Sequence, residues 1–329
     1  MQKKAIICIA VLTSGGDAPG MNAAIRAVTR TALANNVKVF GCNYGFQGMI
    51  ENDFLKLNYQ DIGGIIGLGG TILKTARCEK FATVGGREQA HRNLKEKNID
   101  GVVVIGGDGS FKGAAQFSSE FDIPFIGIPG TIDNDIKGTD YTIGFDTALN
   151  TVVQAVDKIK DTARSHGRIF FVESMGREAG LLALGSGLAC GAEVILIPEV
   201  LEQEEELDKF IKKGLVDKKS SGIIMVAEGY KTGGALKIAE RVKAQHPDIE
   251  ARVTILGHIQ RGGNPTAQDR IVATRMGVAA INSLLAGKKN LMIGIKNQSI
   301  VEVPFGLAEK AYRPINREFV DIQEVITRN

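Results

Sequence analysis

The fold of this chain is decided by two stretches, GVVVIGGDGS at residues 101–110 and IPFIGIPGTIDND at residues 123–135. The apolar run Val102–Ile105 has no polar alternation, which is typical of a strand buried on both faces of a parallel sheet. A second buried strand is predicted at 124–129. Ligands of open α/β sheets bind at the carboxyl ends of the strands. The glycines and aspartates that end both runs therefore predict a site for a metal and an anionic substrate.

Composition narrows the class of protein. A chain of 329 residues predicts one or two domains with an ample core. The net charge of +3, from 40 basic and 37 acidic residues, gives no reason to expect nucleic acid or a membrane surface as partner. The four cysteines, at positions 8, 42, 78 and 190, are far apart, which favours a reducing compartment over a disulfide framework or zinc knuckle.

The N-terminal apolar stretch favours a first strand over a signal peptide. It runs into Thr13-Ser14-Gly15-Gly16-Asp17 and not into a small-residue cleavage site. No apolar run approaches the length of a membrane span. The expected location is the cytoplasm.

Strands and helices alternate along the whole chain, which indicates a doubly wound α/β architecture. The predicted strands are 4–12, 37–42, 101–105, 124–129, 168–173, 193–197, 222–227 and 251–257. The predicted helices are 21–35, 85–98, 145–164, one ending near 217, and 267–286, with loops at 43–49 and 61–77. A constant offset of 160 residues relates Ser14, Gly16, Gly20 and Ala23 to Ser174, Gly176, Gly180 and Ala183. This match suggests two similar βα lobes.

The residues at these strand ends suit phosphoryl transfer, which requires charge neutralisation, positioning and a base for the attacking hydroxyl. Asp108 is a hard oxygen ligand that suits Mg²⁺. The glycine turns offer amide groups to phosphate, and Arg77 offers a cation. Asp133 and Asp135 are candidates for the base. Taken singly, each aspartate is better explained by helix capping or an Asx turn, but the set of them at neighbouring strand ends favours function.

A second group of residues suits the recognition of a phosphorylated acceptor. Its cations lie at strand ends or glycine turns: Arg168, Arg177, Arg252, His258 and Arg261. Glu228 is a candidate acceptor for sugar hydroxyls. The alternative is that the arginines are solvated charges and that His258 is a core histidine.

Eight motifs occur in a fixed order. They are TSGGDAPGMNAAIR, GGTILKTAR, VIGGDGS, GIPGTIDND, GFDTALNT, MGREAG, VAEG and LGHIQRGGNPTAQDR. With these motifs the sequence closely resembles the bacterial ATP-dependent 6-phosphofructokinases over nearly the whole chain, least so after residue 287. The resemblance implies transfer of the ATP γ-phosphoryl group to the 1-hydroxyl of fructose 6-phosphate, giving fructose 1,6-bisphosphate and ADP.

The resemblance also implies an organisation. Two Rossmann-like lobes of mostly parallel sheet flanked by helices are expected, with the active site in the cleft between them. The larger ATP- and Mg-binding lobe is expected at 1–143 plus 260–311, and the smaller sugar-phosphate-binding lobe at 144–259 plus 312–329. A homotetramer with shared active sites is expected.

Individual roles follow from the same resemblance. The residues expected to bind ATP and Mg²⁺ are Gly16, Arg77, Cys78, Gly107, Asp108, Gly109 and Ser110, with Asp108 on the metal. Those expected to meet the sugar phosphate are Thr131, Ile132, Asp133, Met175, Gly176, Arg177, Glu228, His258, Ile259, Gln260 and Arg261. Arg168 and Arg252 are expected to reach across from a neighbouring subunit. The catalytic set is Asp133 as base, with Thr131, Arg177, Gly16 and Arg77.

An effector site for ADP or phosphoenolpyruvate is expected at a subunit boundary. Its residues would be Arg26, Ala27, Val28, Thr29, Arg30, Lys160, Gly191, Ala192, Glu193 and Lys219. The sequence departs from the family at Lys160, Asp217 and Ser221, where Arg, Arg and His are usual. Because Asp217 reverses a charge, blunted or altered allostery is predicted.

Other functions stay open at this stage. A lipid or NAD kinase shares the Gly-Gly-Asp-Gly turn, but would not need the cations at 168, 252 and 258–261. A dehydrogenase is disfavoured because no G-x-G-x-x-G follows the first strand. A silent sugar-phosphate sensor would not need Asp108 and Asp133. Glycines at 109 and 130, where the pyrophosphate-dependent relatives carry Asp and Lys, favour ATP as donor, and an acceptor such as tagatose 6-phosphate remains possible.

Overall fold

The structure is a computed structural model, and it describes residues 6–200, 203–217, 221–310 and 317–327. Contacts within the chain define two compact units. Unit 1 comprises 1–131, 136–147 and 261–311, and unit 2 comprises 132–135, 148–260 and 312–329.

Unit 1 is built on a seven-stranded sheet of order β11-β10-β5-β4-β1-β2-β3. Its strands are β1 (Cys8–Ser14), β2 (Lys38–Cys42), β3 (Phe54–Leu57), β4 (Gly101–Gly106), β5 (Phe125–Pro129), β10 (Leu291–Lys296) and β11 (Ser299–Pro304). The five inner strands run parallel, and only β3 and β11 at the edges pair antiparallel. Every residue of β1, β4 and β5 is buried, as the unbroken apolar runs predicted.

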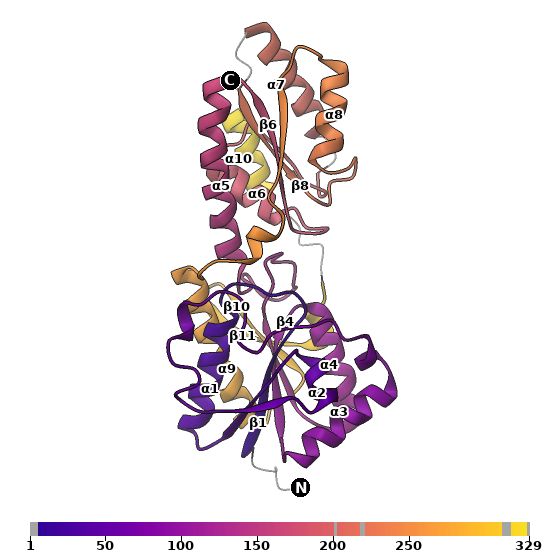
Figure 1. Cartoon of the computed structure of the whole chain (residues 1–329), viewed down its shortest axis with the longest axis vertical. Helices are drawn as coiled ribbons and strands as arrows, with labels where there is room; N and C mark the ends of the chain where they lie inside the picture. Colours follow the sequence, from indigo (N-terminus) through magenta and orange to yellow (C-terminus); the bar gives the residue numbers. More distant parts are fainter. Residues whose placement is uncertain (1–5, 201–202, 218–220, 311–316, 328–329) are drawn as a thin grey trace. The chain divides into compact units, whose positions relative to one another are not determined.

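Helices cover both faces of this sheet, as Figure 1 shows. They are α1 (Met21–Ala34), α2 (Phe46–Glu51), α3 (Val84–Glu96), α4 (Asp108–Phe121) and α9 (Ala267–Leu285). Alternate residues of β1 and β4, such as Leu12 and Val104, face a core that includes Phe111 and Phe117 of α4. The helices α1 and α9 pack closely enough that a Cβ on Gly277 would collide with Ala27.

Unit 2 has a four-stranded parallel sheet of order β7-β8-β6-β9. Its strands are β6 (Ile169–Ser174), β7 (Val194–Leu196), β8 (Gly222–Ala227) and β9 (Ala251–Ile255). Its helices are α6 (Leu181–Cys190), α7 (Gln203–Asp217), α8 (Ala235–Gln245) and α10 (Arg317–Thr327), and α5 (Phe145–His166) contributes from Ala148 onward. One core packs β6 and β8 against α7 and α8.

Two expectations about local structure are wrong. The predicted loop 43–49 contains the start of α2, because Phe46, Met49 and Ile50 bury one side of a short helix in the core. The last strand of unit 2 ends at Ile255, and the chain continues as a 3₁₀ turn at Gly257–Arg261, since Gly257 takes a positive φ of 56°. The predicted start of the first strand, at Lys4, lies outside the described residues.

The predicted internal match has a structural counterpart. β1 ends at Ser14 and β6 at Ser174, while Gly20 and Gly180 are the N-caps of α1 and α6. The two βα turns thus have equal length. Their backbones differ, since φ is 102° at Gly20 and −86° at Gly180.

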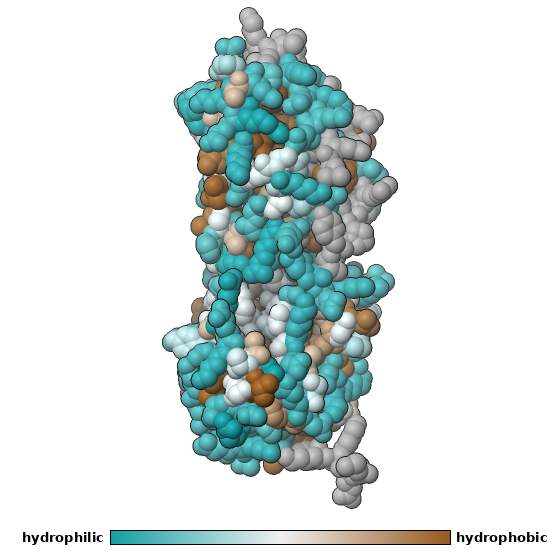
Figure 2. Space-filling model, turned by 90° about the vertical axis from the view of Figure 1, so that its right-hand side faces the viewer, coloured by the Kyte–Doolittle hydropathy of each residue, from teal (hydrophilic) through white to brown (hydrophobic). Residues whose placement is uncertain are grey.

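The face drawn in Figure 2 is mostly hydrophilic, with scattered apolar residues. Among the residues that the structure describes, no helix is both long enough and apolar enough to span a membrane.

Candidate active site

Three glycine turns of unit 1 meet at one edge of its sheet. β4 lies between β1 and β5, and the register pairs Ser14 with Gly106 and Gly106 with Pro129. The amide of Gly130 donates to the carbonyl of Gly106 over 3.0 Å. The predicted nucleotide turns and the start of the 130–135 segment are therefore neighbours, as expected for the carboxyl ends of adjacent parallel strands.

Asp108 is the first residue of α4, and Gly107 occupies the N-cap position. The capping interpretation of Asp108 is therefore wrong. Its Oδ2 lies 3.3 Å from Nζ of the exposed Lys112, one turn further along the helix. A carboxylate at a helix N-terminus, beside glycines, can bind a cation that also contacts phosphate oxygens.

Gly107 and Gly109 are glycines without a structural need. Neither has a positive φ, and a Cβ at either position would have no heavy atom within 4 Å. Glycine within the first turn of a helix, as at Gly109, is less favourable than most residues, whereas glycine is common at the N-cap that Gly107 occupies. Open space next to two such glycines indicates that something outside the chain approaches the backbone here.

The turn after β1 is open in the same way. Among the described residues, no acceptor takes a hydrogen bond from the amides of Gly16, Asp17 or Ala18. Arg261 lies against this turn, since its Nη1 donates to the carbonyl of Asp17 over 3.2 Å and a Cβ on Gly16 would collide with its guanidinium. Free amides and one cation are suited to phosphate.

The loop that carries Arg77 is tied to this edge. The hydroxyl of Thr75 donates to the carbonyl of Gly15 over 2.8 Å, while the Arg77 side chain is exposed. Cys78 is half-buried and its thiol donates to Gln47, and burial raises its pKa, so the thiol is neutral at pH 7. Phe46 of α2 is buried and stacks on Phe81 at 4.1 Å between ring centroids.

Asp133, the predicted base, lies in unit 2 together with Arg177, a second member of the predicted catalytic set. The side chain of Asp133 is 5% exposed, and its Oδ2 lies 3.7 Å from Nε of Arg177, which is half exposed. Arg177 has a positive φ of 54°, which is uncommon for a residue with a side chain. Such strain often occurs at functional sites.

The turn 175–180 is held by side chains from three neighbouring strand ends. Oε1 of Glu228, after β8, accepts from the amides of Gly176 and Arg177 over 3.2 and 2.6 Å. Gln260, after β9, accepts from the amide of Met175 over 3.1 Å. Glu199, after β7, accepts from the amide of Gly180 over 2.7 Å.

The residues predicted to meet the sugar phosphate differ in exposure. Glu228, His258 and Ile259 are exposed, whereas Gln260 is fully buried and also donates to the carbonyl of Gly257. The side chain of Gln260 thus supports the turn 175–180 and is not accessible to a ligand from solvent. Thr131 is half-buried, and Ile132 is buried.

Arg168 and Arg252 lie at the other end of the unit 2 sheet, at the starts of β6 and β9. Glu250 joins them, with its Oε2 2.9 Å from Nε of Arg168 and its Oε1 2.5 Å from Nη2 of Arg252. Arg168, with Arg252 and His166, lowers the pKa of Glu250. Three basic side chains around one carboxylate leave a cationic cluster. Sequence reasoning did not identify Glu250.

The predicted effector residues are mixed in accessibility. Ala27, Val28 and Thr29 are buried in α1, so their side chains have no open surface in this chain. Arg30 is exposed and lies over the ring of Tyr59, and Arg26 is half-buried. In unit 2, Ala192 is buried, Gly191 is exposed, Lys160 is half-buried, and Glu193 accepts from the amide of Ile223. Lys219 and the side chain of Asp217 lie outside the described residues.

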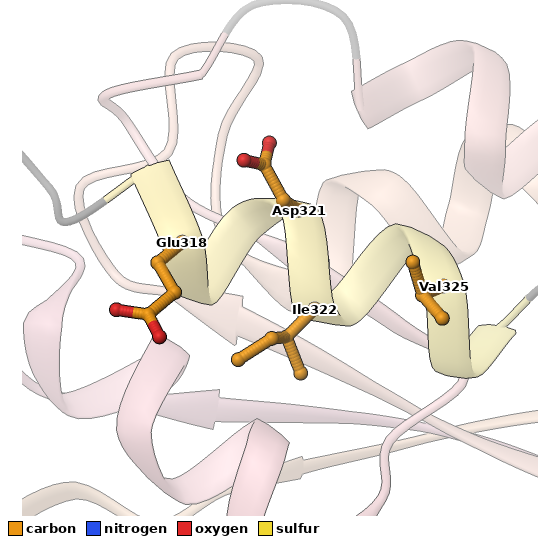
Figure 3. A pocket seen from close by; sticks show the side chains of 4 residues that line it. All are labelled: Glu318, Asp321, Ile322 and Val325. Atoms are coloured by element: carbon orange, nitrogen blue, oxygen red, sulfur yellow. The ribbon is translucent and has the colours of Figure 1, made fainter.

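A pocket of about 490 Å³ lies on α10 and is lined by Glu318, Asp321, Ile322 and Val325. Figure 3 shows Glu318 and Ile322 on one side of the helix and Asp321 on the other. The described residues of its lining include no cation, and two of them are carboxylates, which disfavour phosphate.

The doubly wound fold and these glycine turns are typical of α/β enzymes that bind phosphorylated substrates. The sequence model described as "Phosphofructokinase" matches residues 8–284. The chain therefore belongs to the phosphofructokinase family.

Similar proteins extend over nearly the full length. ATP-dependent 6-phosphofructokinase 2 of Bacteroides thetaiotaomicron is 55% identical over 96% of this chain and 97% of the relative. ATP-dependent 6-phosphofructokinase 1 of Thermus thermophilus is 48% identical over 97% and 98%. Phosphofructokinase from Saccharomyces cerevisiae has a TM-score of 0.87 at 33% identity over 97% of this chain, which spans 46% of the yeast chain.

Proposed function

We propose that this protein is an ATP-dependent 6-phosphofructokinase. It transfers the γ-phosphoryl group of ATP to the 1-hydroxyl of fructose 6-phosphate and releases fructose 1,6-bisphosphate and ADP, a step of glycolysis. The observation that carries the proposal is the open edge of unit 1, where Asp108 and unbonded turn amides lie together, in a chain of this family.

The nucleotide belongs to unit 1. The amides after β1 and β4 face its phosphates, and Arg77 supplies positive charge, while Arg261 beside the first turn is kept for the sugar phosphate. The residues present fit a magnesium ion. No group of three or more candidate ligands occurs among the described residues, and Mg²⁺ is usually held by one or two carboxylates plus substrate phosphates. Asp108 would hold it, and the ion would neutralise charge on the β- and γ-phosphates.

Asp133 is the base. Its carboxylate takes the proton from the sugar 1-hydroxyl while that oxygen forms a bond to the γ-phosphorus and the bond to the β-bridging oxygen breaks. The guanidinium of Arg177, at 3.7 Å, favours the ionised carboxylate that this step needs. Arg177, Met175, Glu228 and His258 then bind the sugar phosphate from the same side of the unit 2 sheet, while Gly176 shapes the turn that carries Arg177.

The glycines at 109 and 130 support ATP as donor. The space beside Gly109 is empty of protein atoms, whereas a Cβ on Gly130 would already lie 3.0 Å from Met21. An Asp at 109 would fill the open space with negative charge, and a Lys at 130 would need the core to move. The open space beside Gly109 can accommodate the α-phosphate of a nucleotide. Pyrophosphate has no α-phosphate, so a pyrophosphate-dependent enzyme would not need this space.

Shared sites explain the two distant arginines. Arg168 directly precedes β6, and Arg177 follows its last residue, Ser174. The six residues of β6 span about 20 Å at about 3.3 Å per residue. One chain therefore cannot direct Arg168 and Arg177 at the same phosphate. A homo-oligomer, for which we propose a tetramer, supplies Arg168 and Arg252 from a neighbouring subunit.

Allosteric control is expected to be weakened. Asp217 puts a negative charge where the family carries a positive one, which opposes binding of anionic effectors. Hill coefficients for fructose 6-phosphate, with and without ADP and phosphoenolpyruvate, test this; a strong shift by both ligands would contradict it.

A coupled assay of ADP release tests the proposed function. ATP with fructose 6-phosphate, tagatose 6-phosphate, NAD or diacylglycerol separates the acceptors, and pyrophosphate in place of ATP, followed by fructose 1,6-bisphosphate formation, separates the donors. Fructose 6-phosphate with ATP is expected to give the highest kcat/KM. Release of ADP with NAD or diacylglycerol alone would reject the proposal.

A further inference from the structure

The geometry points to Glu199 as a positioning residue of the sugar-phosphate subsite. We infer that its carboxylate, together with Glu228 and Gln260, fixes the turn 175–180 and thereby the direction of Arg177. This inference rests on the proposed function, because it assigns a role within the same site.

The turn 175–180 is closed on itself and on its neighbours. The amides of Met175, Gly176, Arg177 and Gly180 all donate to side chains, and the amide of Ala179 donates to the carbonyl of Gly176 over 2.9 Å. The acceptors follow β7, β8 and β9, so every strand end of the unit 2 sheet contributes to the turn after β6. Five of the six amides of the turn thus already have an acceptor.

The equivalent turn of unit 1 behaves in the opposite way. It has the same length, yet the amides of Gly16, Asp17 and Ala18 have no acceptor among the described residues. A turn with free amides can bind phosphate through its backbone, whereas a turn with satisfied amides cannot. The 175–180 turn must therefore act through its side chains, of which Arg177 is the exposed cation.

Glu199 anchors the end of the turn that no other side chain holds. Gly180, whose amide it accepts, is the N-cap of α6, and a Cβ on Gly180 would collide with Ile197 and Glu199. The other oxygen of Glu199 is buried without a hydrogen-bond partner, and burial raises the pKa of this carboxyl. A buried carboxylate that is only partly satisfied costs stability. Its presence here is explained by the amide it holds.

The test compares steady-state kinetics of the whole enzyme and Glu199→Ala. Loss of the acceptor frees the Gly180 amide and lets the turn reorient. KM for fructose 6-phosphate is expected to rise roughly tenfold, the scale of one hydrogen bond to a charged group. KM for ATP and kcat are expected to stay within about twofold, since Glu199 touches neither the nucleotide nor the reacting oxygen. Glu199→Gln keeps an acceptor oxygen and is expected to restore KM.

Glu173→Ala is the matched control. Glu173 is in the same unit, and its Oε2 accepts from the amide of Ala235 at the start of α8 over 2.7 Å. It therefore loses the same kind of contact without loosening the 175–180 turn. Its KM for fructose 6-phosphate is expected to stay at the wild-type value even if thermal unfolding shows an equal loss of stability. An equal rise in KM would reduce Glu199 to general stability and overturn the inference.

A double-mutant cycle with Arg177→Ala examines the coupling itself. If Glu199 acts through Arg177, its removal adds little to the rise in KM once Arg177 is absent. Additive effects would overturn the inference. If Glu199→Ala does not fold, Glu199→Asp takes its place, because it retains the charge on a shorter side chain that cannot reach the Gly180 amide in the same way. An unchanged KM for fructose 6-phosphate in Glu199→Asp would then overturn the inference. Failure of the wild type to phosphorylate fructose 6-phosphate would instead reject the proposed function.

Discussion

Nε of Arg177 lies 3.7 Å from Oδ2 of Asp133, with the cation half exposed and the carboxylate 5% exposed. The two residues come from separate segments of unit 2, one just after β6 and one in the short stretch 132–135. The carboxylate is thus buried beside a cation that solvent can reach.

Asp133→Ser is expected to lower kcat by at least about 10²-fold, the usual scale for a general base, while KM for fructose 6-phosphate changes little. The serine hydroxyl is too weak a base to accept the proton from the sugar. Single-turnover and steady-state rates with saturating ATP measure the effect. A rate near that of the wild type would remove Asp133 from the role of base.

Gly109→Ala is expected to separate stability from activity. Because the added methyl group meets no protein atom and replaces a glycine in α4, the protein should gain about 0.5–1 kcal/mol of unfolding free energy. The same methyl group lies where we propose that the nucleotide approaches, so KM for ATP should rise. Urea unfolding and ATP titration are compared with Gly85→Ala, a second open helical glycine, in α3. An unchanged KM for ATP would place the nucleotide elsewhere.

Arg87→Lys is expected to destabilise unit 1. The buried guanidinium contacts both oxygens of Glu120 at 2.7 Å and also donates to the carbonyls of Phe81 and Ala82. An ammonium group cannot serve all four acceptors. A loss of about 1–3 kcal/mol, the cost of buried groups without partners, is expected in urea unfolding at pH 7. Lys112→Arg, at an exposed pair, is the neutral control.

The same pair predicts a pH dependence. Hydrogen bonds from Arg87 and Gln116 lower the pKa of Glu120 below its ordinary value of 4.5. The folded state therefore binds fewer protons than the unfolded chain as the pH falls below 4.5. The stability that the Glu120 ion pair contributes is thus fully present above that pH, and it is lost as the pH falls through the pKa of Glu120 in the folded state. Glu120→Gln should make the acid side of the stability curve flatter. A curve as steep as that of the wild type would contradict this assignment.

Mixed oligomers examine the shared site. Arg168→Ala and Arg177→Ala are each expected to be poorly active, because each removes one cation from every site. When the two variants are refolded together in equal amounts, about a quarter of the sites should draw both intact halves from different subunits. Separate purification of each variant followed by simple mixing of stable oligomers is the control. Absence of recovery would show that Arg168 and Arg177 do not serve a common site.

The parts of the fold with local signals were predictable. The apolar run at 102–105 defined β4, which proved to lie within a residue of the prediction, whereas α4 begins inside the predicted glycine turn, at Asp108. The start of α2 was missed because its buried side, Phe46, Met49 and Ile50, is too short to give a helical period.

The supporting residues of the candidate site were not predictable from the sequence. Glu199 holds Gly180 across 19 positions, and Glu250 joins cations that are 84 positions apart. A hydrogen bond of this kind depends on strand order, which no local pattern specifies. Glycines 107 and 109 are the reverse case, since the motif marked them but only the empty space around them shows why they matter.

The short strand β6 has a genetic consequence. In the homo-oligomer that we propose, it carries a piece of one site at its start and a piece of another at its end, so each copy of the chain supplies cations to a neighbour and receives cations from one. In a mixed oligomer, a subunit with a substituted arginine would inactivate sites to which an intact subunit contributes the remaining residues. Alleles damaged at either end of β6 should therefore act dominantly in a mixed population, whereas an allele whose product never folds should be silent.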